Sequence, residues 1–299
     1  MKKSITAAVL TVFFIFSPMC FAETVIQTSE GDVLYSDTET PVINTNAVSA
    51  VLIEANSGKI LYEDNKDEMR PMASITKIMT MLLTMEAIEK GALTFEQVLV
   101  CSEHAKSMGG SEIWLEVGEE MSVNDLLKAV AVNSANDAAV MIAEGIAGSI
   151  DAFADMMNEE AMALGATNTH FVNPHGLSDD NHYTTVYDMY LITNEAIKYD
   201  MFNEIIHMPE YTTAYNDKNG NSRELTVGST NYYMQGTASA PTGVTGLGGK
   251  TGTTSAAKSC LVLVSKDTAN NPYISIILRA ETRDDLYSQM TELLGEINN

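Results

Sequence analysis

The sequence predicts a mixed α+β fold, in which strands from both ends of the chain form one sheet beside a helical insert. Apolar runs at 47–54 and 59–63 flank Asn56-Ser57-Gly58, which is typical of a β-hairpin. Three more strand-like runs follow near the other end, at 249–254, 259–265 and 273–280. Helical periodicity occupies the region between them, so the strands of both ends are expected to share a sheet.

The helices of the middle region follow from apolar spacing and from stop signals. In 122–133 the apolar residues recur at the spacing of one helix face, and Gly91 and Gly165 are typical of helix ends. Helices are therefore expected at 74–90, 122–133, 136–147, 150–164, 184–207 (in one piece or two) and 283–297. Residues 211–215 and 223–227 flank a turn and form a further predicted hairpin.

The first 22 residues have the features of an export signal. Lys2 and Lys3 precede an almost wholly apolar run, and Cys20-Phe21-Ala22 offers a cleavage site after Ala22. Lipid attachment at Cys20 is the weaker alternative, because 17–19 lack the residues such a site needs. We therefore predict an exported, extracytoplasmic protein with a signal peptide at 1–22, an extended segment at 23–46 and one domain at 47–299.

Composition excludes some partners. The chain has 17 basic and 40 acidic residues, a net charge of −23, which argues against nucleic acid because phosphates would be repelled. No segment after the leader is apolar enough to cross a membrane.

Two cysteines, Cys101 and Cys260, remain after the leader is cleaved. We favour buried free thiols for both, and a disulfide between them is the alternative.

Three short motifs carry the chemistry. They are Ser74-Ile75-Thr76-Lys77, Ser134-Ala135-Asn136 and Lys250-Thr251-Gly252. Each alone is weak, since the same patterns recur at 255–258 and 229–231. In this order and with this spacing, they supply a nucleophile with an adjacent amine, a second hydroxyl with an amide, and a cation for a carboxylate. The sequence therefore predicts a serine acyl-transfer enzyme.

Ser74 and Lys77 are the predicted nucleophile and base. A serine at a helix start is usually only an N-cap, but residues i and i+3 share a helix face, so the Lys77 amine is expected beside the Ser74 hydroxyl. The apolar stretch after Lys77 predicts a buried helix, in which the ammonium form is disfavoured.

The other two motifs complete the predicted site. Ser134 is expected to pass a proton to the leaving amine, and Asn136 to orient the substrate and Lys77.

Lys250 and Thr251 are expected to hold a substrate carboxylate, and Gly252 to let a substrate backbone approach. The Thr253 N–H would complete an oxyanion hole. The histidines lack a zinc-binding pattern, so we predict neither a metal nor another cofactor.

The chain resembles the low-molecular-weight penicillin-binding proteins that are serine D-Ala-D-Ala carboxypeptidases. The resemblance rests on the three motifs in their context, on Gly110-Ser111 with Leu115 and Gly118-Glu119, and on Asn173-Pro174-His175-Gly176-Leu177. It implies a serine β-lactamase/transpeptidase-like fold, with a five-stranded, mainly antiparallel sheet covered by helices beside a helical lobe. It also implies that 47–299 is a DD-peptidase catalytic domain.

The resemblance implies an activity and partners as well. Ser74 would attack the penultimate D-Ala carbonyl of a peptidoglycan stem peptide, releasing the terminal D-Ala, and β-lactams would acylate Ser74 as inhibitors. Relatives often place an arginine near the start of the last helix for the terminal carboxylate. Here 286–289 occupies that place, which leaves Arg283 or Arg279 as the substitute.

Two alternatives remain. A β-lactamase of the same fold would need a deacylating base, and the class A string Glu-x-x-Leu-Asn is absent from the sequence. A non-catalytic wall-binding protein would usually have lost one of the site residues, all of which are present. Many relatives also carry a C-terminal β-rich domain and a membrane anchor; this sequence ends at Asn299, so attachment by that route is not expected.

Overall fold

The computed structural model describes residues 49–298, and the predicted leader and extended segment lie outside this range. Its main sheet has five strands in the order β2-β1-β9-β8-β7, and each neighbouring pair is antiparallel. The strands are β1 Ser49–Glu54, β2 Ile60–Asp64, β7 Thr245–Thr254, β8 Lys258–Lys266 and β9 Pro272–Ala280. This arrangement confirms that the sheet is assembled from both ends of the chain.

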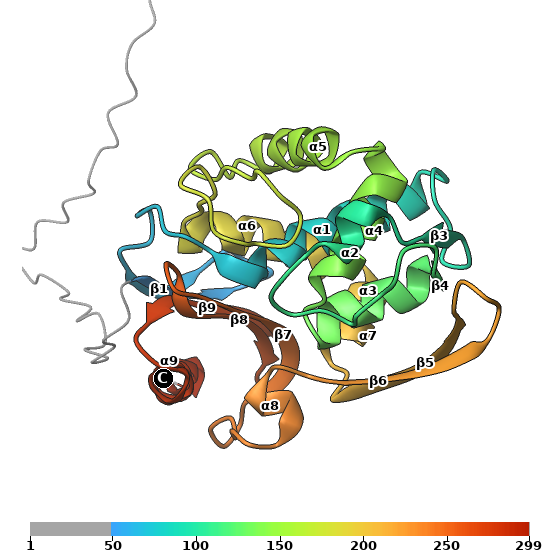
Figure 1. The fold of residues 1–299 in the computed structure, drawn as a ribbon. Helices are drawn as coiled ribbons and strands as arrows, with labels where there is room; N and C mark the ends of the chain where they lie inside the picture. Colours follow the sequence, from blue (N-terminus) through green and yellow to red (C-terminus); the bar gives the residue numbers. More distant parts are fainter. Residues whose placement is uncertain (1–48, 299) are drawn as a thin grey trace, which may run out of the picture. The chain divides into compact units, whose positions relative to one another are not determined.

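Both faces of the main sheet are covered, which explains why its central strands are apolar on both sides. Along β1, Val51 and Ile53 belong to the core on the helical side, whereas Ala50 and Leu52 belong to the core under helix α9 (Arg283–Gly295). Figure 1 shows α9 below the sheet and α1, α5 and α6 above it. Thr282 caps α9 by accepting a hydrogen bond from the Asp285 N–H, and a short 3-10 turn, η2 (Glu296–Asn298), follows the helix.

The helical region surrounds one central helix, α1 (Lys77–Glu89), which follows the 3-10 turn η1 (Ala73–Thr76). Ten of its residues are buried, as expected of a helix that is apolar on nearly every side. It packs against α3, α4, α5, α6 and α7. The helices are α2 Glu103–Lys106, α3 Val123–Val132, α4 Asn136–Ala147, α5 Ile150–Ala163, α6 Val186–Ala196, α7 Asp200–Ile206 and α8 Tyr232–Gln235. The predicted break at 134–136 and the two pieces of 184–207 are both confirmed.

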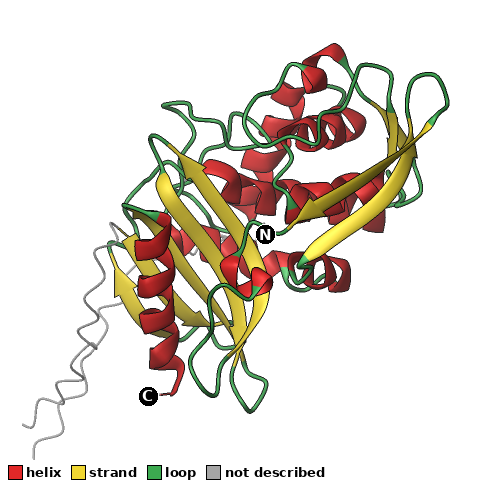
Figure 2. Cartoon of the chain, turned by 60° about the horizontal axis from the view of Figure 1, so that its bottom comes forward, coloured by secondary structure: helices red, strands yellow, loops and turns green. Residues whose placement is uncertain are grey.

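A second sheet lies apart from the first. It has the order β3-β4-β5-β6, formed by β3 Val98–Val100, β4 Glu120–Ser122, β5 Glu210–Asn216 and β6 Ser222–Gly228. The hairpin β5–β6 matches the prediction, but its pairing with β3 and β4 was not foreseen. Figure 2 shows this long hairpin at the opposite end of the domain from α9.

Two remaining expectations concern cysteines and membranes. Cys101 and Cys260 are buried free cysteines. Burial raises the pKa of the Cys101 thiol to about 11 and that of Cys260 to about 12, so both stay protonated and unreactive at neutral pH. Within residues 49–298, the helices are too short or too polar for any of them to traverse a bilayer.

Candidate active site

Ser74 and Lys77 meet where the 3-10 turn η1 continues into α1. Ser74 is the second residue of η1 and is partly exposed, whereas Lys77 begins α1 and is completely buried. Lys77 Nζ lies 3.1 Å from Ser74 Oγ. The helix has no side-chain N-cap at this end, so Ser74 faces the lysine and does not act as a cap.

The surroundings of Lys77 suit a neutral amine. Nζ lies 2.7 Å from Asn136 Oδ1 and 2.6 Å from the His175 carbonyl oxygen. Two N–H bonds can serve these two acceptors, which leaves the lone pair for the Ser74 hydroxyl proton. Burial, together with the positive charge of Lys250, lowers the pKa of Lys77 well below its usual value, although Asp137 opposes the shift.

The Ser134–Asn136 motif lies between α3 and α4. Asn136 Nδ2 donates to the Gly109 carbonyl at 2.6 Å, which orients the amide so that its oxygen faces Lys77. Ser134 has a left-handed backbone, with φ of +67°, and its buried Oγ has no hydrogen-bond partner among the described residues. This hydroxyl is therefore available to a bound molecule.

The Lys250 motif lies on β7, the edge strand of the main sheet beside η1. Lys250 is buried, and its Nζ donates only to the Thr251 carbonyl within the described chain, at 2.9 Å. Burial, with a smaller effect of Arg283, lowers the pKa of Lys250 to about 7. The Thr251 hydroxyl pairs with that of Thr230 at 2.5 Å.

Gly252 lets β7 pack closely against the turn that carries Ser74. A Cβ atom built on it would lie 2.9 Å from the Ser74 nitrogen and 3.0 Å from both the Ile75 nitrogen and the Met72 carbonyl oxygen. The missing side chain therefore lets β7 approach the Ser74 turn, and the approach of a substrate backbone at Gly252 stays a prediction. Thr253, the next residue, is exposed.

The turn before Ser74 is held in a strained conformation. Ala73 has φ of +47°, which is costly for a residue with a side chain. Gly176 packs directly on it, since a Cβ at Gly176 would lie 2.0 Å from the Ala73 carbonyl oxygen. The same carbonyl accepts a hydrogen bond from Thr76 Oγ1 at 2.7 Å.

His182 completes this arrangement, and its tautomer follows from its partners. The Val172 N–H donates to His182 Nδ1 at 3.1 Å, so the ring proton lies on Nε2. Nε2 then donates to Thr76 Oγ1, 2.7 Å away, and Thr76 donates to Ala73. Burial is the main cause that lowers the pKa of His182 to about 4, which keeps the ring neutral.

The 173–177 segment supports the family resemblance, but its sequence predicts no role for it in the site. In the structure the carbonyl of His175 binds Lys77, and burial lowers the pKa of the His175 ring to about 3. A backbone acceptor has no residue signature, so the sequence held no signal for it. Asp137 was also missed: its buried carboxylate accepts the N–H groups of Ile113 and Leu115 and so fixes the loop beside Asn136. In the part of the chain described, no three His, Cys, Asp or Glu side chains are grouped to hold a metal ion.

Comparison with known proteins decides the family. Residues 35–282 match the Peptidase_S11 family, described as D-alanyl-D-alanine carboxypeptidase. The chain belongs to this family. It is 37% identical over 297 residues to the D-alanyl-D-alanine carboxypeptidase DacF of Bacillus subtilis, covering 98% of this chain and 70% of the relative. The DacC enzyme of Escherichia coli is 31% identical over 294 residues, covering 96% of this chain and 67% of the relative.

Solved structures of DD-peptidases share the fold. The D-alanyl-D-alanine carboxypeptidase DacD of Francisella tularensis superimposes with a TM-score of 0.76 at 28% identity, covering 86% of this chain and 71% of that one. The Streptomyces K15 DD-transpeptidase gives a TM-score of 0.77 at 25% identity, covering 84% of this chain and 97% of that one. The predicted five-stranded, β-lactamase-like fold with a helical lobe is confirmed by these likenesses and by the sheet order.

Proposed function

We propose that this protein removes the terminal D-Ala from peptidoglycan stem peptides through an acyl-enzyme on Ser74. The observation that carries the proposal is the buried Lys77 amine, 3.1 Å from Ser74 Oγ, with its pKa lowered toward the neutral form. A neutral amine at this distance accepts the hydroxyl proton as the oxygen attacks. Membership of the D-alanyl-D-alanine carboxypeptidase family supports the choice of substrate.

The reaction has two stages. Lys77 takes the proton from Ser74 Oγ, which bonds to the penultimate D-Ala carbonyl carbon, and the N–H groups of Ser74 and Thr253 stabilise the oxyanion. The C–N bond then breaks as the leaving nitrogen receives a proton through the Ser134 hydroxyl, which Lys77 resupplies. Water hydrolyses the ester in the second stage and restores Ser74. The unpartnered Ser134 Oγ supports its role as the relay.

Lys250 and Thr251 bind the terminal carboxylate of the substrate. We propose that Arg283 binds the same carboxylate. Arg283 lies at the first turn of α9, where the helix dipole disfavours a cation. Its guanidinium is held 5.3 Å from the Tyr232 ring centre, and no described carboxylate forms an ion pair with it. Its charge also reaches Lys250, as the lowered pKa of that lysine indicates. Lys250 and Arg283 have no acidic partner among the described residues and so suit an anion, and the effect of Arg283 on the pKa of Lys250, which Arg279 does not share, favours Arg283 over Arg279.

β-Lactams acylate Ser74 as mimics of D-Ala-D-Ala in this proposal, and the acyl-enzyme hydrolyses slowly. The family comparison does not favour a β-lactamase or a non-catalytic wall protein. Export with cleavage after Ala22 fits a wall substrate outside the cytoplasm, and this part of the proposal rests on residues 1–22 of the sequence alone.

The test is D-Ala release from diacetyl-Lys-D-Ala-D-Ala, with nitrocefin hydrolysis measured in parallel. We expect D-Ala release with little nitrocefin turnover. Ser74→Ala is expected to abolish both D-Ala release and labelling by a fluorescent penicillin, while the thermal transition stays near that of the wild type. D-Ala release retained by Ser74→Ala would refute the assigned nucleophile, and fast nitrocefin turnover without D-Ala release would make the enzyme a β-lactamase.

A further inference from the structure

A pocket of about 430 Å³ opens where β7 ends, beyond the proposed oxyanion hole. Three segments line it: 69–71 just before Ser74, part of the loop 178–183, and Ala256 in the turn after β7. Ser178 Oγ donates to Thr254 Oγ1 at 3.1 Å, so the loop is joined to the last residue of the strand. The segments that line the pocket thus adjoin those that build the active site.

The proposed function fixes which part of the substrate reaches this pocket, and the inference rests on that function. The terminal carboxylate lies at Lys250 and Thr251, and the attacked carbonyl lies at the Thr253 N–H. The peptide therefore runs along the free edge of β7, with its N-terminal direction toward Thr254. The residue that precedes D-Ala-D-Ala is placed about one strand position beyond Thr253, where the pocket begins.

The pocket combines apolar walls with acidic groups. Met69, Pro71 and Ala256 provide apolar surface, and Asp179 and Asp180 are exposed on the loop. Asp180 has no hydrogen bond or ion pair with another described residue. Asp179 Oδ1 accepts the Asn181 N–H at 2.8 Å, which fixes the carboxylate without neutralising it.

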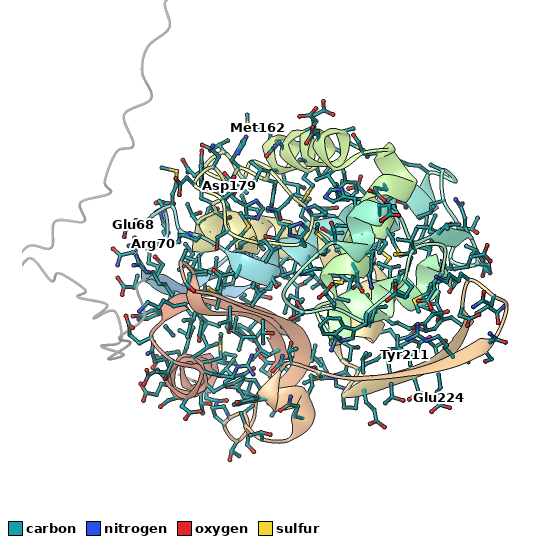
Figure 3. The ribbon with its side chains drawn as sticks, in the orientation of Figure 1. Glu68, Arg70, Met162, Asp179, Tyr211 and Glu224 are labelled. Carbon is teal, nitrogen blue, oxygen red and sulfur yellow. The ribbon has the colours of Figure 1, made fainter. Side chains whose placement is uncertain are left out.

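The pocket has one cation of its own, and that cation is already paired. Arg70 forms an ion pair with Glu68, so the two aspartates give the pocket a net negative charge. Figure 3 shows Glu68 and Arg70 together at one edge of the domain, with Asp179 above them on the same side.

We propose that this pocket binds the side chain of the residue preceding D-Ala-D-Ala and selects one that ends in a primary ammonium group. The methylene groups of such a side chain pack on the apolar wall, as they do along apolar protein surfaces generally. Its ammonium group pairs with the carboxylates of Asp179 and Asp180. A neutral or acylated side chain of the same length lacks this pairing.

The test compares three peptides of the form acetyl-X-D-Ala-D-Ala, where X is lysine, Nε-acetyl-lysine or norleucine. The lysine peptide is expected to have a kcat/KM about fivefold higher than the other two, the range given by exposed ion pairs. The preference should fall as salt is added, because salt screens exposed charges.

Two variants assign the preference to the pocket. Asp179→Asn combined with Asp180→Asn should bring the three peptides to equal kcat/KM, and the asparagine at 179 keeps an acceptor for the Asn181 N–H. Glu224→Gln removes one negative charge at an exposed position of β6, far from the pocket (Figure 3), and should keep the preference. Unchanged labelling by a fluorescent penicillin shows that each variant has a folded site.

The outcomes separate the inference from the function on which it rests. Equal cleavage of all three peptides by the wild type, or a lysine preference that survives the double substitution, would overturn the pocket assignment and leave the carboxypeptidase intact. Failure to release D-Ala from any of the peptides would contradict the carboxypeptidase itself and the inference with it.

Discussion

At the scale of single residues, the site depends on two lysines that are buried at a cost in stability. Lys77 and Lys250 are each at most 1% exposed, and neither forms an ion pair with a carboxylate of residues 49–298. Desolvation disfavours both charges; the positive charge of Lys250 adds to this effect at Lys77, and that of Arg283 adds to it at Lys250. The same penalty that weakens the fold keeps Lys77 in the neutral form that can accept a proton and leaves Lys250 without a competing carboxylate, so stability and function oppose each other here.

Lys250→Met tests this opposition. The pKa of Lys250 is about 7 in the folded protein and 10.5 as the reference value, so the unfolded chain binds more protons between these values. The wild type therefore gains stability from this group as pH rises through that window. The variant should melt roughly 3 °C or more higher near pH 6, lose this advantage near pH 10, and release little D-Ala.

Thermal unfolding at the two pH values measures the effect, and D-Ala release measures the loss of function. A variant that melts below the wild type at both pH values would show that packing around Lys250 outweighs its desolvation.

Substitution of Thr76 tests the hydrogen bonds that link His182 through Thr76 to the Ala73 carbonyl. Thr76→Val keeps the shape but removes both hydrogen bonds, which leaves His182 Nε2 and the Ala73 carbonyl without this partner. We expect acylation by a fluorescent penicillin to slow about tenfold, because the turn that carries Ser74 loses its support. Thr76→Ser keeps the hydroxyl and should stay within about twofold of the wild type.

Nitrogen NMR shifts of the His182 ring give a second measurement of the hydrogen bonds from His182 through Thr76 to the Ala73 carbonyl. The wild type and Thr76→Ser should show the proton on Nε2, and the valine variant should show a changed Nε2 shift. Equal acylation rates in all three proteins would mean that the Ala73 turn does not need Thr76.

At the scale of elements, the site is a junction of η1, β7 and the 173–177 segment, and glycines allow their close contact. Gly176 and Gly220 make a matched pair, since both have a positive φ, +89° and +80°. A Cβ at Gly176 would meet the Ala73 backbone, whereas one at Gly220 would meet nothing within 4 Å. Gly220→Ala should cost about 1 kcal/mol of unfolding free energy, and Gly176→Ala about 2 kcal/mol more.

Urea denaturation measures both glycine variants, and penicillin labelling reports on the site. Gly176→Ala should label poorly while Gly220→Ala labels normally, because only the first displaces the turn before Ser74. Equal losses of unfolding free energy in the two variants would show that backbone strain alone causes the loss, and that the contact with Ala73 adds nothing.

At the scale of the whole molecule, the sequence was sufficient for the main sheet, the helical insert and the order of the motifs. These follow from long periodic segments and from the resemblance to a known family. The second sheet was not foreseen, because β3 and β4 have three residues each and β4 meets β5 through a single pair, Glu120 with Asn216. Strands this short carry too little alternation to be recognised.

The site was partly predictable for a related reason. Side-chain chemistry marks Ser74 and Lys77 in the sequence, but the carbonyl of His175 and the left-handed backbone at Ala73 have no such mark. The packing of Gly252 on the Ser74 turn was not predicted, because the sequence does not show that this turn occupies the space beside it. Contacts between backbones far apart in sequence depend on the tertiary fold alone.

The sheet that joins both ends of the chain makes the active site depend on strands that are far apart in sequence. Ser49 pairs with Leu278, and Gly252 packs against the Ser74 turn, so residues near the start of the domain need partners near its end. Such long-range pairing makes folding slow and leaves the helical segments without their sheet until it forms. A chain in which β7 has not yet paired carries the nucleophile and its lysine but lacks the strand beside them. We therefore expect activity to appear only late in folding, after the last quarter of the chain has joined the sheet.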